Sequence, residues 1–395
     1  MRAAGQGEST SEVPPILPQP ATPAFSKPVF LMTNSLERGG TERQFVRLAG
    51  SLKSCGYLVK LGCIMKTGPF IEDLTRCGFH ELAEFGLGGS LYGMQSWKTR
   101  WRLMRHLREL HIAVAHSFDF YVNLTLVPAA KLAGVPVIGS QRQLGDLLTP
   151  AQFRAQLEMF RWCQHVVCNS RAAADRLVQS GLRASKIVVI GNGLPPSSFT
   201  KTHPALENIA GRLRVGMVAR MNTPAKNHDL FLRAASRLRK RFPDTEFLLV
   251  GDGPLREQLE KLTSDLGLER QVRFLGDRSD IQAILASMDI SVLASSTESL
   301  SNVMIESMAA GIPVVATAVG GNVELGADGR AVLVAPNDEK ALADGLERLL
   351  AEEQLRLDIS RLAWRFAEER FSLGRIRQQY SELYAEAYHG AANVH

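Results

Sequence analysis

The sequence predicts an α/β protein built from two doubly wound parallel sheets that face each other across a cleft. At 395 residues the chain is longer than a single hydrophobic core usually supports, which favours two domains. Short apolar runs alternate with segments of helical periodicity in two successive sets, the pattern that parallel strands and their crossover helices produce. A hydrophobic content of 45% with 7% aromatic residues and 33 glycines fits a globular protein of this class.

Composition divides the chain into a tail, two domains, a linker and a terminal helix. Residues 1–26 contain five prolines and no apolar period, which predicts a flexible tail. A first Rossmann-like domain is expected over residues 27–195, where glycine and proline cluster at its end. A linker over residues 196–210 leads to a second Rossmann-like domain over residues 211–370, and a helix is expected over residues 371–395.

Cysteine usage and hydropathy exclude several classes of protein. The five cysteines are odd in number and none are spaced Cys-x-x-Cys, so neither a disulfide framework nor a zinc site is indicated. No apolar run approaches the roughly 18 to 20 residues of a membrane span, and the tail lacks a basic segment followed by an apolar one. We therefore expect a cytoplasmic protein in a reducing compartment.

Charge is distributed unevenly along the chain. The net charge is +6, but residues 1–205 hold 23 Lys and Arg against 13 Asp and Glu, or +10, which leaves −4 for the rest. The first half should therefore face an acidic partner. RNA-binding and helix-turn-helix patterns do not occur, so nucleic acid is not expected, and an anionic lipid surface or a phosphate-bearing acceptor fits better.

The first predicted element is a buried strand at residues 28–32, whose loop leads into Gly39, Gly40 and a helix that ends near Leu52. Paired glycines at a helix start allow a ligand to approach the backbone closely. A tight turn explains the same pair more simply, and the pattern by itself leaves both interpretations open.

A basic helix is predicted from about Trp97 to Leu110, after a strand near residues 58–64 and a short helix near residues 71–77. Its five basic side chains alternate with tryptophans and other apolar residues, which suits a helix that lies on an anionic membrane. A helix packed on a parallel sheet requires the same apolar spacing, with its basic residues in solvent. Both interpretations are open.

Two further strands bring polar side chains to the carboxyl edge of the first sheet, where open α/β sheets bind ligands. The strand at residues 112–115 ends at His116, and the strand at residues 135–139 leads to Arg142. A lone histidine at a strand end is commonly a packed or capping residue, although this edge favours contact with a ligand. Arg142 suits an acceptor phosphate or, equally, a structural ion pair. The remaining elements expected here are helices at 122–132, 150–162 and 170–177 and strands at 165–168 and 187–190.

The second domain is expected to open with a strand over residues 213–219 that presents Arg220. Lys226 follows on the same loop, just before a helix over residues 229–239. Two cations on one loop would stabilise the charge of a departing diphosphate. Basic residues near strand ends are common, so the spacing of Arg220 and Lys226 alone is weak evidence for a diphosphate site, and the residues around them must support it.

A glycine-rich turn follows the next predicted strand, residues 247–250. Gly251 and Gly253 look like the start of a dinucleotide fingerprint, but Arg256 stands where its third glycine belongs. An acidic residue is also missing at the required distance, so a nicotinamide cofactor is not expected. Another strand and its loop are predicted over residues 272–277.

The stretch from residue 292 to residue 321 carries the most specific pattern in the chain. A short strand leads into a Ser/Thr loop that contains Glu298, and a helix follows with Glu306 one turn inside it. Two carboxylates suit the hydroxyl groups of a sugar or a ribose. The residues whose free backbone N–H groups suit an anion are Leu300, Ser301 and Asn302.

In its full context this stretch closely resembles the donor-site signature of the retaining GT-B glycosyltransferases of family 4. The resemblance rests on Glu298-x7-Glu306, on the run from Ala309 to Thr317 and on Gly320-Gly321, and it extends from about residue 29 to residue 388. It implies a GT-B fold and a hexosyltransferase that uses a nucleotide sugar, for which we expect UDP. It also implies that the C-terminal helix returns to the first domain.

The resemblance implies a role for each candidate residue. His116 is expected to orient the donor sugar, Glu298 to hold one of its hydroxyls, and Glu306 to bind the ribose. Arg220 and Lys226 are expected to bind the departing phosphates, so that the expected catalytic residues are His116, Arg220, Lys226 and Glu298. The remaining expected donor-binding residues are Gly39, Gly40, Gly251, Leu275, Gly276, Asp277, Arg278, Leu300, Ser301 and Asn302.

The partners implied by the resemblance are a nucleotide sugar and a glycan or lipid-linked acceptor, with Arg142 as the candidate acceptor-binding residue. An Asp-x-Asp motif does not occur, so no metal is expected, and no cofactor is expected because the nucleotide sugar is a co-substrate. The implied setting is cell-envelope or exopolysaccharide synthesis at the inner face of the membrane. A catalytically silent GT-B protein that binds nucleotide sugars and a GT-B epimerase are the alternatives.

Overall fold

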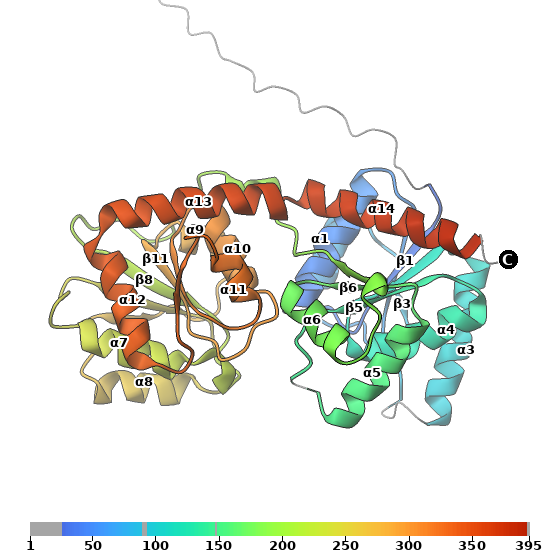
Figure 1. Ribbon diagram of the computed structural model, residues 1–395, viewed down its shortest axis with the longest axis horizontal. Helices are drawn as coiled ribbons and strands as arrows, with labels where there is room; N and C mark the ends of the chain where they lie inside the picture. The colour runs from blue at the N-terminus through green and yellow to red at the C-terminus, as the bar shows by residue number, and fades with distance from the viewer. Residues whose placement is uncertain (1–25, 89–92, 147, 393–395) are drawn as a thin grey trace, which may run out of the picture.

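The structure is a computed structural model that describes residues 26–88, 93–146 and 148–392. Apart from residue 26, the tail predicted over residues 1–26 lies outside the described residues. The described chain forms two α/β halves joined side by side, with long helices running across the top of both in the view of Figure 1.

The first half contains a sheet of seven parallel strands in the order β3-β2-β1-β4-β5-β6-β7. Its strands are β1 (Val29–Thr33), β2 (Val59–Cys63), β3 (Ala83–Glu84), β4 (Val114–Ser117), β5 (Val137–Gln141), β6 (His165–Cys168) and β7 (Ile187–Val189). Its helices are α1 (Gly40–Ser54), α2 (Phe70–Arg76), α3 (Met94–Glu109), α4 (Phe120–Ala133), α5 (Pro150–Trp162) and α6 (Arg171–Gln179).

The second half contains a sheet of six parallel strands in the order β10-β9-β8-β11-β12-β13. Its strands are β8 (Arg214–Val218), β9 (Glu246–Val250), β10 (Val272–Phe274), β11 (Ile290–Leu293), β12 (Val314–Thr317) and β13 (Val332–Val334). Its helices are α7 (His228–Leu238), α8 (Arg256–Asp265), α9 (Ile281–Leu285), α10 (Asn302–Ala309), α11 (Gly321–Gly326) and α12 (Glu339–Ala351), followed by α13 (Glu353–Phe371) and α14 (Leu373–Ala392).

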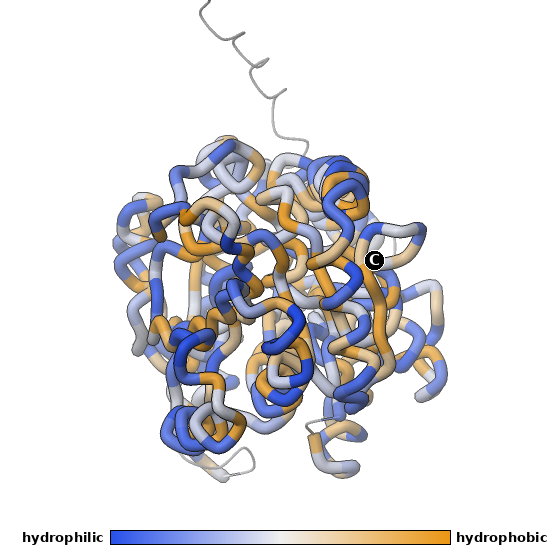
Figure 2. The backbone as a smooth tube through the Cα atoms, turned by 90° about the vertical axis from the view of Figure 1, so that its left-hand side faces the viewer, coloured by the Kyte–Doolittle hydropathy of each residue, from blue (hydrophilic) through white to orange (hydrophobic). Residues whose placement is uncertain are grey.

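Both sheets confirm the predicted doubly wound class. Their central strands are buried along nearly their whole length, as in β1 and β9, because helices cover both faces of a parallel sheet. Figure 2 shows the hydrophobic stretches concentrated in the interior and the hydrophilic ones on the outer turns and helices. In each sheet the strand order reverses beside the first strand, at β1/β4 and at β8/β11, and the carboxyl ends of strands at such a reversal form a ligand crevice.

The C-terminal helix α14 returns to the first half, as the resemblance implied. Tyr380, Leu383 and Tyr384 are buried in the same core as β1 and α1. Two crossings between the halves lie side by side, because the Leu194 N–H donates to the Phe371 carbonyl at 2.7 Å and the Leu373 N–H donates to the Leu194 carbonyl at 2.8 Å. The two halves are thus held at a shared hinge.

Two strands extend further than predicted. The predicted end of a strand at Ala115 is wrong, because β4 continues to Ser117 and pairs through His116 with Leu31 of β1 and Ile138 of β5. Similarly, β5 continues to Gln141, so that Arg142 is the first residue after it. Polar residues are accommodated inside these strands because neighbouring side chains supply their hydrogen bonds.

Helix α3 also differs in extent, since it begins at Met94 rather than near Trp97. None of the helices within the described ranges combines the length and the apolar character that crossing a bilayer requires.

Candidate active site

A cleft of about 1850 Å³ separates the two halves. It is lined by the loops that follow β1, β8, β10 and β11 and by the first turns of α1 and α10. The halves contact each other across it, through an ion pair between Arg38 and Asp277 and through hydrogen bonds such as that from the Ser299 hydroxyl to Asn169 Oδ1 at 2.6 Å. The structure therefore holds the cleft in a closed arrangement.

The loops after β8 and β11 are joined to each other at the reversal point of the second sheet. Lys226 Nζ lies 2.5 Å from Glu298 Oε1, and the Ser295 hydroxyl donates to the same oxygen at 2.9 Å. A backbone hydrogen bond of 2.9 Å from Ser296 to Ala225 fixes the two loops in register. The predicted cation Lys226 and the predicted carboxylate Glu298 thus form a partly buried ion pair at the edge of the cleft.

Gly320 and Gly321 explain why the second half of the signature contains two glycines. Gly320 has a φ of +46°, and a Cβ atom there would lie 1.7 Å from the Glu298 carbonyl oxygen. The Gly321 N–H donates to that same carbonyl at 3.1 Å. Only glycine permits this approach, so the pair supports the loop that carries Glu298.

The first turn of α10 meets the first turn of α1 across the cleft. Ser301 caps α10, because its side chain accepts a hydrogen bond from the Met304 N–H at 3.3 Å. Asn302 Oδ1 accepts from Asn192 at 2.8 Å and from Gln44 at 3.4 Å. A Cβ atom at Gly40 would lie 2.6 Å from Asn302 Nδ2, so Gly40 permits the close approach of the two helices.

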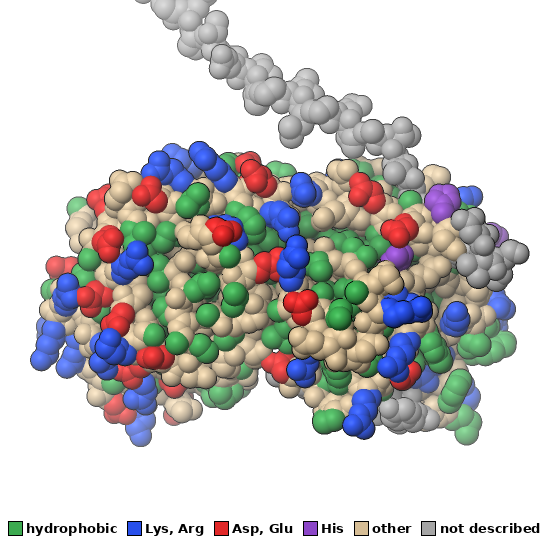
Figure 3. Space-filling model, in the orientation of Figure 1, with side chains coloured by type: hydrophobic (Ala, Val, Ile, Leu, Met, Phe, Trp, Pro, Cys, Tyr) green, Lys and Arg blue, Asp and Glu red, His purple; other side chains and the backbone are tan. Residues whose placement is uncertain are grey.

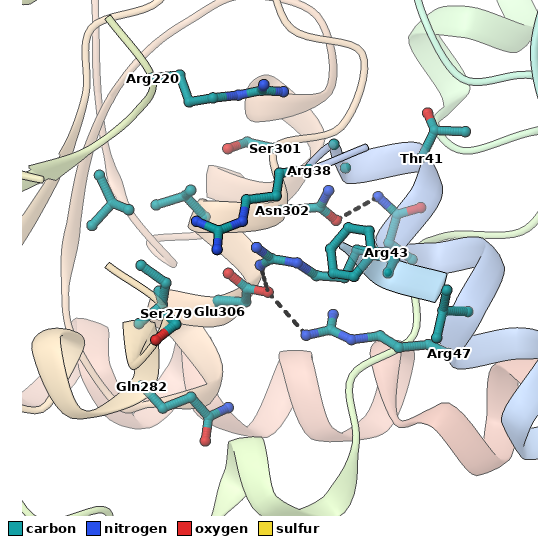
Figure 4. Close-up of a pocket in the computed structure, with 18 of the residues that line it drawn as sticks. Arg38, Thr41, Arg43, Arg47, Arg220, Ser279, Gln282, Ser301, Asn302 and Glu306 are labelled. Carbon is teal, nitrogen blue, oxygen red and sulfur yellow. Dashed lines mark hydrogen bonds and ion pairs between the residues drawn. The ribbon is translucent and has the colours of Figure 1, made fainter. Parts of the chain in front are cut away.

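Glu306 lies one turn further into α10 and is almost completely buried. Its Oε1 atom lies 3.3 Å from Arg43 Nη1 and 3.2 Å from Arg47 Nη2, and both arginines belong to α1 of the other half. Figure 4 shows the two arginines extending from α1 toward Glu306. Burial lowers the pKa of Arg47, against the opposite effect of Glu306.

Arg220 follows β8 and is exposed in the cleft, where it makes no hydrogen bond or ion pair with another described residue. Figure 4 shows it apart from the Glu306 group, on the other side of Ser301 and Arg38. Its guanidinium is therefore available to an anion.

The loop after β10 and the first turn of α9 line the cleft over residues 277–283, which extends the predicted set by Ser279, Asp280, Ile281, Gln282 and Ala283. Two predicted residues, Leu275 and Gly276, are not among the lining residues. Leu275 packs on a hydrophobic cluster, and the Gly276 carbonyl accepts a hydrogen bond of 2.8 Å from the Gly251 N–H.

His116 is not brought to the cleft. It is fully buried, and its two ring nitrogens are 2.9 Å from the Tyr384 hydroxyl and 2.9 Å from the Ser140 hydroxyl. Burial and the nearby Arg142 charge hold the pKa of His116 well below its ordinary value, so the ring is neutral. Because β4 continues past it, His116 lies inside the strand and does not face the cleft. Its hydrogen bond to Tyr384 instead helps to hold α14 against the first half.

Arg142 lines the cleft but is already committed to neighbours. Its Nη1 donates to Asn192 Oδ1 and its Nη2 to the Tyr380 hydroxyl, both at 2.9 Å. The guanidinium carbon lies 4.9 Å from the ring centre of Phe118. These contacts join the end of β5 to the hinge and to α14. The partners of Arg142 among the described residues are thus an amide oxygen, a hydroxyl and an aromatic ring, and not the carboxylate of the structural ion pair expected as its alternative role.

Two carboxyl groups near the carboxyl edge of the first sheet have unusual surroundings. Asp119 caps α4 and accepts from the Asn34 N–H at 2.7 Å and from the Val122 N–H at 3.1 Å, and burial raises its pKa to about 7. Burial also raises the pKa of Glu42, in the first turn of α1.

Several cleft residues were not predicted from the sequence. The arginines Arg43 and Arg47 stand four residues apart on the helix after Gly39-Gly40, which places them on one helix face. That spacing is a usable signal, but it does not say what the face meets. Their partner, Glu306, lies 263 and 259 residues further along the chain.

Two family models match the chain, one for each half. The model described as "Glycosyltransferase Family 4" matches residues 38–198, and the model described as "Glycosyl transferases group 1" matches residues 212–352. The lipopolysaccharide core biosynthesis glycosyltransferase LpsE of Rhizobium meliloti (strain 1021) is 31% identical over 368 residues, which cover 88% of this chain and 96% of that relative.

Solved structures of Anabaena HepE share the fold. The complex of HepE with UDP has a TM-score of 0.80 at 24% identity and covers 91% of this chain and 99% of its own. The complex with UDP-glucose has a TM-score of 0.79 at 23% identity and covers 91% of this chain and 100% of its own. The two-sheet fold of this chain is therefore similar to that of HepE, which has been solved with UDP and with UDP-glucose.

Proposed function

Because the chain belongs to the family 4, group 1 glycosyltransferases, we propose that it transfers a hexose from a UDP-sugar to a glycan or lipid-linked acceptor with retention of anomeric configuration. The observation that carries the proposal is the Lys226–Glu298 pair, which lines the same cleft as Arg220 at the point where the strand order of the second sheet reverses. Arg220 makes no hydrogen bond or ion pair with another residue that the structure describes.

The diphosphate of the donor binds between Arg220, Lys226 and the first turn of α10. When the bond from the sugar to the diphosphate breaks, negative charge develops on the leaving oxygen, and preorganised cations lower the barrier by stabilising that charge. The backbone N–H groups of Leu300, Ser301 and Asn302 add the positive end of a helix dipole. These groups supply the positive charge of the site without a metal ion.

The two glutamates of the signature place the sugar and the ribose. Glu298 accepts a hydrogen bond from a donor-sugar hydroxyl, while its Oε1 atom accepts hydrogen bonds from Lys226 and Ser295. Glu306 accepts from the ribose hydroxyls. The uracil lies against the end of the loop after β10 and the first turn of α9, where Asp277, Arg278 and Gln282 line the cleft. Support for the nucleotide comes from HepE, which binds UDP and UDP-glucose.

The acceptor is held by the basic first half, at an anionic membrane surface. Helix α3 turns Trp97 and Trp101 outward, with 63% and 58% of their surfaces exposed, and its outer face also carries exposed Lys98, Arg102 and Arg105. Exposed tryptophans beside basic side chains suit the boundary between lipid headgroups and acyl chains. Figure 3 shows hydrophobic and basic side chains adjacent over α3. LpsE, which is named for lipopolysaccharide core biosynthesis, supports a cell-envelope glycan as the product class.

A thermal-shift screen with nucleotides and nucleotide sugars, followed by an assay for released nucleotide, tests the proposal. A UDP-hexose should stabilise the protein, and free UDP should accumulate slowly even without an acceptor. Stabilisation without release would favour the silent binding protein, whereas interconversion of the nucleotide sugar without an acceptor would favour an epimerase. The absence of any uridine-specific shift would contradict the proposed donor.

A further inference from the structure

We propose that Arg43 and Arg47 of α1 are positioning residues for the donor: they hold Glu306 from the opposite half of the molecule, so that the ribose binds tightly only when the cleft is closed. The inference rests on the proposed function for the identity of the ligand. Its structural basis is the contact of two arginines with one buried carboxylate across the cleft.

The geometry places both guanidinium groups on the same carboxylate oxygen. Arg43 Nη1 and Arg47 Nη2 lie 3.3 and 3.2 Å from Glu306 Oε1, and no described residue donates a hydrogen bond to Oε2. One oxygen of Glu306 is thus fixed, while the other is left to accept a hydroxyl. Because Oε1 is held, the orientation of Oε2, the atom that would accept a ribose hydroxyl, is also fixed.

The two arginines are held to different degrees. The Arg47 side chain is 19% exposed, and its Nη1 also donates to the Gly193 carbonyl at 3.3 Å, at the hinge between the halves. The Arg43 side chain is 38% exposed and reaches Glu306 from one turn earlier on α1. Arg47 is therefore the more firmly held partner of Glu306, and Arg43 is the more exposed one.

Burial explains why Glu306 needs partners from the other half. Its side chain is only 4% exposed, and a buried carboxylate without a compensating charge is strongly unfavourable. Lys226, which lies on the loop after β8 of the same half, pairs with Glu298 and not with Glu306. Within the described chain the compensating charges for Glu306 come from α1, so opening the cleft removes them.

This arrangement couples donor binding to closure. A ribose bound to Glu306 stabilises the state in which the carboxylate is correctly held, and that state is the closed one. The coupling is reciprocal: if closure raises the affinity for the nucleotide by some factor, bound nucleotide raises the equilibrium constant for closure by the same factor. The arginines act through Glu306 without touching the reacting bond, so their loss should raise KM for the donor far more than it lowers kcat.

Titration calorimetry with UDP tests the inference in Arg47→Gln, Arg43→Gln, Glu306→Gln and the pairwise combinations. We expect Kd for UDP to rise about 30-fold or more in Arg47→Gln, as for the loss of one partner of a buried charge pair, and less in Arg43→Gln, which is more exposed. In the Glu306→Gln background the arginine substitutions should have almost no further effect, because each acts through that carboxylate. Arg47→Lys, which restores the charge, should recover part of the affinity.

Arg76→Gln is the matched control. Arg76 lines the same cleft from the same half, but its ion pairs are to Asp73 and Glu72 of its own helix. The control removes the same charge and should leave Kd for UDP within about two-fold of the wild-type value, as expected for an exposed pair. Thermal melts of every variant exclude loss of folding as the cause of a changed affinity.

Small-angle scattering gives a second readout, which does not depend on turnover. The decrease in radius of gyration on adding UDP should be present in the wild type and lost in the Arg43→Gln/Arg47→Gln variant. Wild-type affinity or wild-type compaction in that variant, or additive losses with Glu306→Gln, would overturn the inference while leaving the proposed function standing. Failure of the wild type to bind UDP at all would overturn both.

Discussion

Lys226 Nζ and Glu298 Oε1 lie 2.5 Å apart and join the loops that follow β8 and β11, the two strands between which the order of the second sheet reverses. Lys226 is 33% exposed at its side chain and Glu298 is 13% exposed, so the pair lies at the wall of the cleft with one face toward a ligand. In the proposed function the cation binds a phosphate of the donor and the carboxylate accepts a hydrogen bond from a sugar hydroxyl.

This pair should behave as a unit in steady-state kinetics. Lys226→Ala is expected to lower kcat by about 100-fold or more, because a cation that stabilises the leaving diphosphate acts mainly in the transition state. Glu298→Gln should lower kcat by about ten-fold, and the double variant should lose much less than the product of the two effects. Independent, multiplicative losses in a donor-hydrolysis assay would show that the contact has no role in turnover.

Arg220 and Lys226 should make the reaction independent of metal ions. Turnover in excess EDTA is expected to equal turnover in untreated enzyme, since these two side chains and the first turn of α10 provide the positive charge. Arg220→Ala should lower kcat by about 100-fold to 1000-fold with a small change in nucleotide affinity. Loss of activity with EDTA and its recovery with manganese would refute the role given to the two cations.

The outer face of α3 should bind anionic membranes. Trp97→Ser combined with Trp101→Ser is expected to weaken sedimentation with vesicles of phosphatidylglycerol by about five-fold or more, with little change for neutral vesicles. Trp162→Ser is the matched control, because Trp162 is 49% exposed on α5. If the three tryptophans contribute equally, α3 is not the surface that meets the membrane.

Asp119 should make folding stability depend on pH in the weakly acidic range. Its pKa in the folded protein is about 7, raised by burial from the ordinary value of 3.8. Between these two pH values the folded protein keeps a proton that the unfolded chain has released, so the free energy of unfolding falls as the pH rises through this window, by up to about 1.4 kcal/mol per pH unit from this group.

Asp119→Asn should remove that dependence. Urea denaturation at pH 5 and pH 8 is expected to show a smaller loss of stability at pH 8 for the variant than for the wild type. Asp338→Asn is a suitable control, since Asp338 caps α12 in the same way but is exposed. A pH dependence equal to that of the wild type would mean that Asp119 is not the group responsible.

The sequence carried enough information for the fold class and most of one side of the cleft. Strands such as β1 and β9 are continuous apolar runs, and the loops that contain Lys226 and Glu298 follow their strands directly. These are local relationships, which periodicity and turn residues report well. For the same reason α10 was correctly predicted to begin at Ser301 or Asn302.

Relationships between the halves were not predictable in this way. Arg43 and Arg47 meet Glu306 only because the two sheets face each other, and no local pattern encodes that contact. His116 was expected just after the strand at residues 112–115, at the edge of the sheet that binds ligands. Here Tyr384, from the far end of the chain, supplies a hydrogen bond that lets the histidine stay inside β4.

Retention of configuration and the role of Arg220 are tested together by proton NMR of the hexose released from a panel of α-linked UDP-hexoses, without an acceptor, by the wild type and by Arg220→Ala. At least one donor should yield UDP and, as the first product, the hexose in the α configuration, and Arg220→Ala should release it about 100-fold more slowly. Release of the β-configured hexose would show that the reaction inverts, and equal rates for the two proteins with every donor would show that Arg220 does not stabilise the leaving diphosphate.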